Sequence, residues 1–130
     1  VVVAARNAAA AADVLALLAR HNVRAAHVPL ERWAEDTRPL VISTLALAGS
    51  SAAGDALDVS GSSFAGSTLL DVVYADWPTP LARTARDHGA EIVSGLDMLV
   101  YQAAAQIELM TGRPGPVGAM FAAVLEADSS

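Results

Sequence analysis

The chain has 130 residues, of which 54% are hydrophobic, and its formal net charge is −6. This length provides one domain, and that much apolar material is enough to bury a core, which excludes a disordered chain. All eight basic residues are arginines that form no run, so a surface that binds nucleic acid is not expected. Because the chain has no cysteine, disulfides and thiolate nucleophiles are excluded, as suits a cytoplasmic protein.

Three further classes of function are disfavoured by residue content. No apolar stretch approaches the roughly 18 residues of a membrane span, so no membrane contact is expected. Since the chain contains no lysine, a lysine base or a Schiff base cannot reside in it. His21, His27 and His88 are scattered without the spacing of metal ligands, so no metal site is predicted.

Short apolar runs alternate with helical patterns, which is typical of parallel strands covered on both faces by crossover helices. The chain is therefore predicted to be an α/β domain. Strands are predicted at residues 1–5, 23–28, 40–45, 69–74 and 91–94. Helices are predicted at 8–21, 79–88, 96–111 and 116–127, with a single helical turn at 31–36.

Residues 49–67 are rich in Gly, Ser and Ala, and we expect loops there with at most one short helix. Gly49 to Gly54 has the glycine spacing of a phosphate-binding P-loop, but Asp55-Ala56 stands where Lys-Ser/Thr is required. We interpret it as a flexible loop. The chain opens directly on an apolar strand without an initiator methionine, so we expect it to be part of a longer sequence.

The exit of the first strand carries the most informative local feature, Arg6-Asn7 directly before a helix. In Rossmann-like domains an acidic side chain near this point binds the ribose of NAD, whereas an arginine suits the extra phosphate of NADP. The Arg6 guanidinium can bind a phosphate, and Asn7 is a suitable N-cap for a helix whose free N–H groups attract anions. The alternative is an ordinary surface arginine that ends a strand, and both interpretations stay open at this point.

Two later segments contain polar side chains at places where open α/β sheets bind ligands. Tyr74 follows a predicted strand, and Met98 and Gln102 lie four residues apart on one face of a predicted helix that begins after Gly95. A tyrosine hydroxyl and an amide can bind a hydroxylated ligand, and a thioether can pack on a flat ring. A packed tyrosine, a gap-filling methionine and a solvated glutamine remain the alternative.

Four motifs in the second half occur together in one order and spacing. They are Asp-Val-Val-Tyr at 71–74, Pro-Thr-Pro-Leu at 78–81, Gly-Leu-x-Met-Leu-Val-x-Gln-Ala-Ala at 95–104 and Thr-Gly at 111–112. Together they resemble the C-terminal signature of the shikimate and quinate dehydrogenase family, and the first half of the chain resembles that family more loosely. The resemblance implies a Rossmann-like, doubly wound parallel sheet with C-terminal helices.

The resemblance also implies roles for individual residues toward the cofactor NADP. Arg6 falls on the arginine that contacts the 2′-phosphate, and Asn7 stands where Thr or Ser is usual. Val72 and Gly95 fall on residues that contact the nicotinamide end, and Met98 falls on a residue packed beside the ring.

Toward the substrate, the resemblance implies roles for Tyr74 and Gln102, which match residues that face the shikimate hydroxyl and carboxylate. Ser43 and Thr44 lie where the family carries an Asn-Ala pair followed by Thr, so they match weakly. Asp76 replaces a proline that is usual after the tyrosine.

The activity implied is NADPH-dependent reduction of 3-dehydroshikimate to shikimate, an oxidoreductase step of aromatic amino-acid biosynthesis. In this family the catalytic lysine and its aspartate belong to an N-terminal substrate domain, so no catalytic residue is expected in this chain. The small-molecule substrate is then the main partner, and a homodimer is left open. The alternatives are a quinate/shikimate dehydrogenase paralogue and a non-catalytic nucleotide-binding module of the same fold.

Neither the first strand of such a domain nor its Gly-rich loop is found in the sequence, so residues 1–130 are expected to form a partial dinucleotide-binding domain. In the usual strand order 3-2-1-4-5-6 the first strand lies between the strands predicted at 1–5 and 40–45. We therefore expect a gap in the middle of the sheet, poor folding of the isolated chain, and another segment that fills the gap. Direct pairing of those two strands would contradict this expectation.

Overall fold

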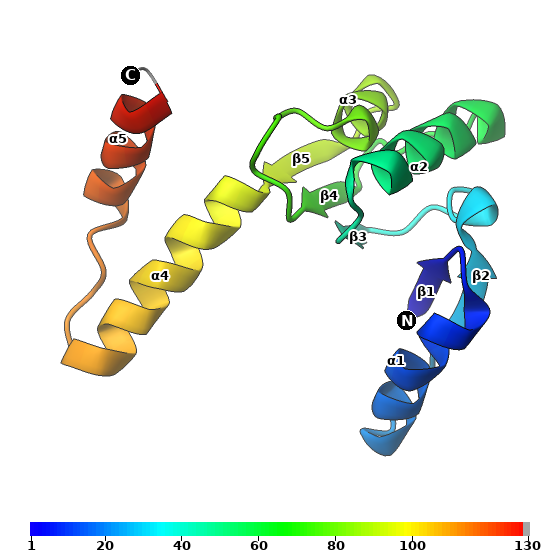
Figure 1. Ribbon diagram of the computed structural model, residues 1–130, viewed down its shortest axis with the longest axis horizontal. Coiled ribbons are helices and arrows are strands. Elements are labelled where there is room, and N and C mark those ends of the chain that lie inside the picture. Colours follow the sequence, from blue (N-terminus) through cyan, green and yellow to red (C-terminus); the bar gives the residue numbers. More distant parts are fainter. Residues whose placement is uncertain (129–130) are drawn as a thin grey trace.

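A computed structural model describes residues 1–128 of the chain. Strands and helices alternate as far as the start of α4, and α5 ends the chain (Figure 1). The elements are β1 (Val2–Ala5), α1 (Ala8–Arg20), β2 (Ala26–Pro29), the 3₁₀ helix η1 (Leu30–Arg32), β3 (Leu40–Ser43), α2 (Leu47–Ser60), β4 (Thr68–Asp71), α3 (Pro80–Asp87), β5 (Glu91–Ser94), α4 (Gly95–Thr111) and α5 (Val117–Asp128). This alternation confirms the α/β class.

The strands form two separate parallel sheets. β1 pairs with β2, and β3, β4 and β5 pair in that order. Each pair of neighbouring strands is joined through a helix, which is the connection that parallel strands need. Figure 1 shows the β1–β2 unit with α1 on one side of the molecule and the three-stranded sheet with α2 and α3 on the other.

A cavity of about 710 Å³ separates the two sheets. Val1, Val2 and Ala4 line it on one side and residues 40–45 on the other. The inner strand β3 leaves Leu40 and Ile42 more than half exposed, although both are aliphatic side chains in a parallel strand. In the described part of the chain β1 pairs with β2 and β3 pairs with β4, so the predicted gap is present and the contradicting pairing is not formed.

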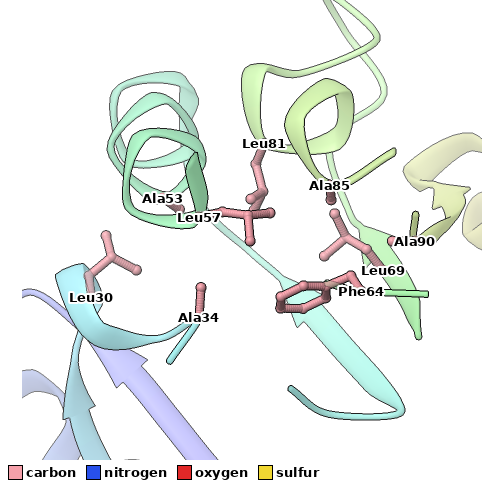
Figure 2. Close-up of a cluster of buried hydrophobic side chains, with 9 residues drawn as sticks. All are labelled: Leu30, Ala34, Ala53, Leu57, Phe64, Leu69, Leu81, Ala85 and Ala90. Carbon is pink, nitrogen blue, oxygen red and sulfur yellow. The ribbon is translucent and has the colours of Figure 1, made fainter. Parts of the chain in front are cut away.

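The hydrophobic core lies where α2 and α3 cover the three-stranded sheet, and η1 closes one side of it (Figure 2). Trp33 contributes from the side: its ring lies 5.3 Å from that of Phe64, and its Nε1 donates to the carbonyl oxygen of Ala53 at 2.9 Å. Phe64, Leu57 and Leu69 are the largest of the core side chains, each 2% exposed or less. The core residues are Leu30, Ala34, Ala53, Leu57, Phe64, Leu69, Leu81, Ala85 and Ala90.

The prediction of loops with at most one short helix at 49–67 is wrong for residues 49–60, because residues 47–60 form the 14-residue helix α2, whereas residues 61–67 are irregular as predicted. The segment from Gly49 to Gly54 is helical rather than a loop: Gly54 is buried, and a Cβ there would lie 3.2 Å from the Thr84 hydroxyl and 3.7 Å from the Leu81 Cα. The small residues let α2 lie close to α3. Tertiary packing thus overrides a weak helix propensity.

Three predicted strands lie elsewhere or end early. β2 begins at Ala26 rather than residue 23, because residues 21–22 form a turn in which Asn22 has φ 57° and residues 23–25 are irregular. The strand predicted at 40–45 ends at Ser43, and the one predicted at 69–74 ends at Asp71. In both cases the residues beyond the strand leave the sheet to enter the connection to the next helix.

The last two helices extend away from the sheet (Figure 1). α4 begins with a capping box between Ser94 and Asp97 and ends at Gly112, whose φ of 69° is left-handed. α5 runs back beside α4, and the rings of Tyr101 and Phe121 meet edge to face at 5.8 Å. Among the described helices, none has the length and apolarity to cross a membrane.

Candidate functional site

The carboxyl ends of β3, β4 and β5 meet at one edge of the sheet. Their parallel register places Ser43, Asp71 and Ser94 side by side as the last residues of their strands. Thr44, Val72 and Gly95 therefore leave the sheet next to one another. This edge is where open α/β sheets bind ligands, and it brings together the predicted cofactor-binding residues Val72 and Gly95.

Val72 and Gly95 are in direct backbone contact. A Cβ built on Gly95 would lie 2.1 Å from the Val72 carbonyl oxygen, a distance that no side chain tolerates. The N–H of Gly95 donates to the Val73 carbonyl oxygen at 3.3 Å. A glycine is therefore required at position 95 for β4 to exit across the start of α4.

Ser43 supports the same exit from the other side. Its carbonyl oxygen accepts a hydrogen bond from the Val72 N–H at 3.0 Å. Its buried side-chain hydroxyl accepts a hydrogen bond from the Leu45 N–H at 3.5 Å. The weakly matched Ser43 thus has a backbone role in holding Val72. Thr44, the next residue, is exposed.

Tyr74 lies in the loop of residues 72–79, hereafter the β4–α3 loop, and is 62% exposed. Asp76, which stands where a proline is usual, has φ 53° in this loop, a left-handed conformation that proline cannot adopt. The loop therefore presents the tyrosine beyond the sheet edge rather than burying it.

Met98 and Gln102 occupy successive turns at the start of α4. Met98 is half-buried and Gln102 is exposed. Gln102 borders an apolar groove of about 460 Å³ between α4 and α5, which is lined by residues that include Leu99, Val100 and Met120. The Gln102 amide therefore lies at the edge of an apolar groove that extends to Leu96 at the beginning of α4.

Arg6 and Asn7 lie at the carboxyl end of β1, on the two-stranded sheet. The Asn7 side chain accepts the Ala9 N–H at 2.9 Å and caps α1, as predicted, and the Arg6 side chain is exposed. These two residues are on the other side of the cavity from Val72 and Gly95. The predicted site is thus present as two clusters, one on each sheet.

Sequence reasoning missed a buried hydrogen-bond network behind the β4–α3 loop. The Asp71 carboxylate accepts the Thr79 hydroxyl at 2.7 Å and the Val73 N–H at 3.3 Å. Ser50 in α2 accepts the Leu81 N–H at 3.0 Å. The signal was available, since Thr79 directly precedes a proline at the first helical position, the pattern of an N-cap.

A second missed feature is the cap of α4, readable as Ser-x-x-Asp before an apolar run. The Asp97 carboxylate accepts both the hydroxyl and the N–H of Ser94, at 2.6 and 2.9 Å. These hydrogen bonds, the hydroxyl first, lower the pKa of Asp97. Within the described residues no group of three or more His, Asp or Glu side chains could hold a metal ion.

Residues 95–125 match the family model of the shikimate 5'-dehydrogenase C-terminal domain. A curated shikimate dehydrogenase (NADP(+)) from Anaeromyxobacter sp. (strain Fw109-5) is 52% identical over 60 residues, which are 46% of this chain and 21% of that protein. The crystal structure of shikimate dehydrogenase from Mycobacterium tuberculosis is 34% identical and superposes with a TM-score of 0.75 over 96% of this chain. The resemblance to the shikimate dehydrogenase family is confirmed.

The Thermus thermophilus shikimate 5-dehydrogenase, solved in complex with NADP(H) and shikimate, is 27% identical with a TM-score of 0.71 over 97% of this chain. The chain covers 45% of that structure and 46% of the mycobacterial shikimate dehydrogenase. It therefore spans less than half the length of these dehydrogenases. The likeness confirms the Rossmann-like fold over nearly the whole chain, with the strand gap described above.

Proposed function

We propose that this chain is the cofactor-binding part of an NADP-dependent shikimate dehydrogenase, which reduces 3-dehydroshikimate to shikimate with NADPH. The observation that carries the proposal is the convergence of Val72 and Gly95 at the carboxyl edge of the sheet, in a fold similar to one solved with both ligands. Their backbone contact leaves no side chain at position 95, so a flat ring could approach the sheet edge closely there.

Arg6 and Asn7 fit the adenosine end of NADP. The exposed guanidinium at the end of β1 offers two parallel N–H donors to a 2′-phosphate. The Asn7-capped N-terminus of α1 adds a partial positive charge beside it. A phosphate beside Arg6 would not be repelled by a carboxylate from the same segment, because residues 1–12 contain no Asp or Glu.

For the nicotinamide end, we assign Val72 and Gly95 to backbone contact and Met98 to packing beside the ring. NADPH supplies the hydride when bound. The residues of this chain hold the ring at the sheet edge and keep an apolar thioether next to it, which excludes water from that side.

Tyr74 and Gln102 are our candidates for the substrate. Tyr74 projects from the exposed β4–α3 loop and Gln102 lies one turn beyond Met98, so both can offer hydrogen-bonding groups to a hydroxylated acid. We assign no catalytic residue to this chain, and we place the proton-transferring lysine in a separate N-terminal substrate domain. The whole enzyme is expected to work in the cytoplasm, with no nucleic acid or membrane as partner.

We also propose that residues 1–130 form a partial dinucleotide-binding domain whose central strand comes from outside them. The edges of β1 and β3 that face each other form no strand pairing with one another. The aliphatic side chains of Val2, Leu40 and Ile42 line the space between these two edges. A parallel strand placed there would pair both edges and bury these side chains. The Gly-rich phosphate-binding loop of a Rossmann-like domain would follow the carboxyl end of this strand.

The decisive experiment is to assay the full-length polypeptide that contains this chain, crossing shikimate and quinate with NADP and NAD. We expect turnover with shikimate and NADP above the other three combinations. Preference for quinate would favour the quinate/shikimate paralogue. Binding of NADP without turnover of either acid would favour a non-catalytic nucleotide-binding module, and absence of both would refute the proposal.

A further inference from the structure

We infer that Asp71 is a positioning residue, whose buried carboxylate fixes both ends of the β4–α3 loop and thereby sets where Val72 and Tyr74 lie at the ligand-binding edge. The inference about the loop rests on hydrogen bonds within this chain. Its consequence for turnover rests on the proposed function.

One side chain joins the two ends of an eight-residue loop. Asp71 Oδ1 accepts the N–H of Val73, at the start of the loop, at 3.3 Å. Its Oδ2 accepts the hydroxyl of Thr79, at the end of the loop, at 2.7 Å. Asp71 is 0% exposed and Thr79 is 2% exposed, so water does not compete for either hydrogen bond.

A carboxylate satisfies both donors of this site, whereas an amide does not. The Thr79 oxygen already accepts the Ala82 N–H at 3.1 Å as the N-cap of α3, so its single proton is free for donation to Asp71. Two donors, the Thr79 hydroxyl and the Val73 N–H, therefore face Asp71. An asparagine offers only one acceptor oxygen. With that oxygen on the Val73 N–H, its NH₂ group would face the Thr79 oxygen and leave the buried hydroxyl proton of Thr79 without an acceptor.

Other hydrogen bonds to the sheet edge hold only the beginning of the loop. Val72 donates to the Ser43 carbonyl oxygen at 3.0 Å, and the Val73 carbonyl oxygen accepts the Gly95 N–H at 3.3 Å. The end of the loop is otherwise bonded to α3, where Arg83 Nη1 donates to the Pro78 carbonyl oxygen at 2.6 Å. Beyond Val73 the Asp71–Thr79 hydrogen bond ties the far end of the loop back to the sheet. Burying the Asp71 carboxylate costs free energy. This cost is offset by the two groups that donate to it, the Val73 N–H and the Thr79 hydroxyl, and by the N-terminus of α3. Tyr74 lies between the two fixed ends.

The test compares Asp71→Asn with Ser50→Ala in the full-length polypeptide. Ser50 is equally buried and accepts the Leu81 N–H at 3.0 Å, so its loss removes a buried hydrogen bond to α3 but none to residues 72–79. We expect Asp71→Asn to raise the KM for shikimate about tenfold with less than about a threefold change in the Kd for NADP. Ser50→Ala should leave both constants unchanged. Equal KM values in the two variants would overturn the inference.

A second pair of variants covers the case in which Asp71→Asn does not fold. Thr79→Val removes the hydroxyl and should raise the KM in the same way, whereas Thr79→Ser restores the donor and should return it to the wild-type value. Failure of Thr79→Ser to rescue would show that the methyl group, rather than the hydrogen bond to Asp71, matters.

Hydrogen–deuterium exchange separates failure of this inference from failure of the proposed function. If the wild-type polypeptide does not oxidise shikimate, the proposed function fails, and the exchange of residues 72–79 then decides the inference. We expect about tenfold faster exchange of these amides in Asp71→Asn and wild-type exchange in Ser50→Ala. Equal exchange in the two variants would overturn it.

Discussion

The Val72 carbonyl oxygen lies where a side chain at position 95 would begin, 2.1 Å from an ideal Cβ. Gly95 is thus the residue that allows β4 to leave the sheet directly above the start of α4. The contact joins the exit of one strand to the helix that follows the next strand, and it fixes the geometry of the candidate nicotinamide site.

Gly95→Ala is expected to lower the free energy of unfolding by about 1–3 kcal/mol, because the new methyl group forces the backbone of Val72 away. It should also reduce shikimate turnover, since that backbone belongs to the candidate site. Urea denaturation and steady-state kinetics of the full-length polypeptide test both effects. Gly118→Ala is the control: it lies in α5, a Cβ there meets nothing within 4 Å, and it should stabilise the helix by about 0.5–1 kcal/mol. Equal effects at both positions would be inconsistent with the steric argument.

Arg6→Ala is expected to weaken NADP binding about ten- to a hundredfold and NAD binding less than about threefold, because only NADP carries the 2′-phosphate. Titration calorimetry of the two cofactors measures this difference. Arg20→Ala, an exposed arginine in the last turn of α1, is the matched control and should change neither affinity. Equal losses for NADP and NAD in Arg6→Ala would mean that Arg6 does not bind the 2′-phosphate.

His88 is expected to make stability depend on pH. Its Nδ1 lies 2.8 Å from the Ser62 carbonyl oxygen and its Nε2 lies 3.0 Å from Asp58 Oδ1, and both acceptors favour the doubly protonated ring. The Ser62 carbonyl first, and the Asp58 carboxylate second, raise the pKa of His88 above 6.5.

Since the folded-state pKa of His88 is raised, its stabilisation is complete below pH 6.5 and is lost as the pH rises through the folded-state pKa. Urea midpoints of the wild type should therefore fall across this range more than those of His88→Asn. A His21→Asn variant is the control, because His21 is an exposed residue at the end of α1. The same pH profile in wild type and His88→Asn would refute the assignment.

Ile42→Ala tests the proposed central strand. Ile42 is 59% exposed at the edge of β3, so in the absence of a covering strand its truncation should cost less than about 0.5 kcal/mol. If a strand covers it in the full-length polypeptide, the loss should be about 2–4 kcal/mol and similar to that of Leu69→Ala, whose side chain is 1% exposed. Chemical denaturation distinguishes these results, and a loss in the smaller range would argue against the strand.

The sequence by itself determined the α/β class, the order of the strands, and most of the helices. Apolar runs and helical periodicity are local signals, and Asn7 marked the start of α1 because its capping preference is local too. The motifs from Asp71 to Tyr74 and from Gly95 to Ala104 also indicated the resemblance to shikimate dehydrogenases before any contact was known. Nevertheless, residues 49–67 were interpreted as loops with one short helix at most, whereas residues 47–60 form α2. The glycines that lower helix propensity are the ones that close packing against α3 requires.

Only the tertiary structure decided which residues meet at the site. The register that sets Ser43, Asp71 and Ser94 in one row depends on pairing between strands that are far apart in sequence, and no local pattern encodes it. The Asp71–Thr79 hydrogen bond was likewise missed, because the partner of a buried carboxylate depends on which residues the tertiary structure packs around it. The cavity between β1 and β3 was predicted from strand order, but its aliphatic walls became visible only once both sheets were placed in space.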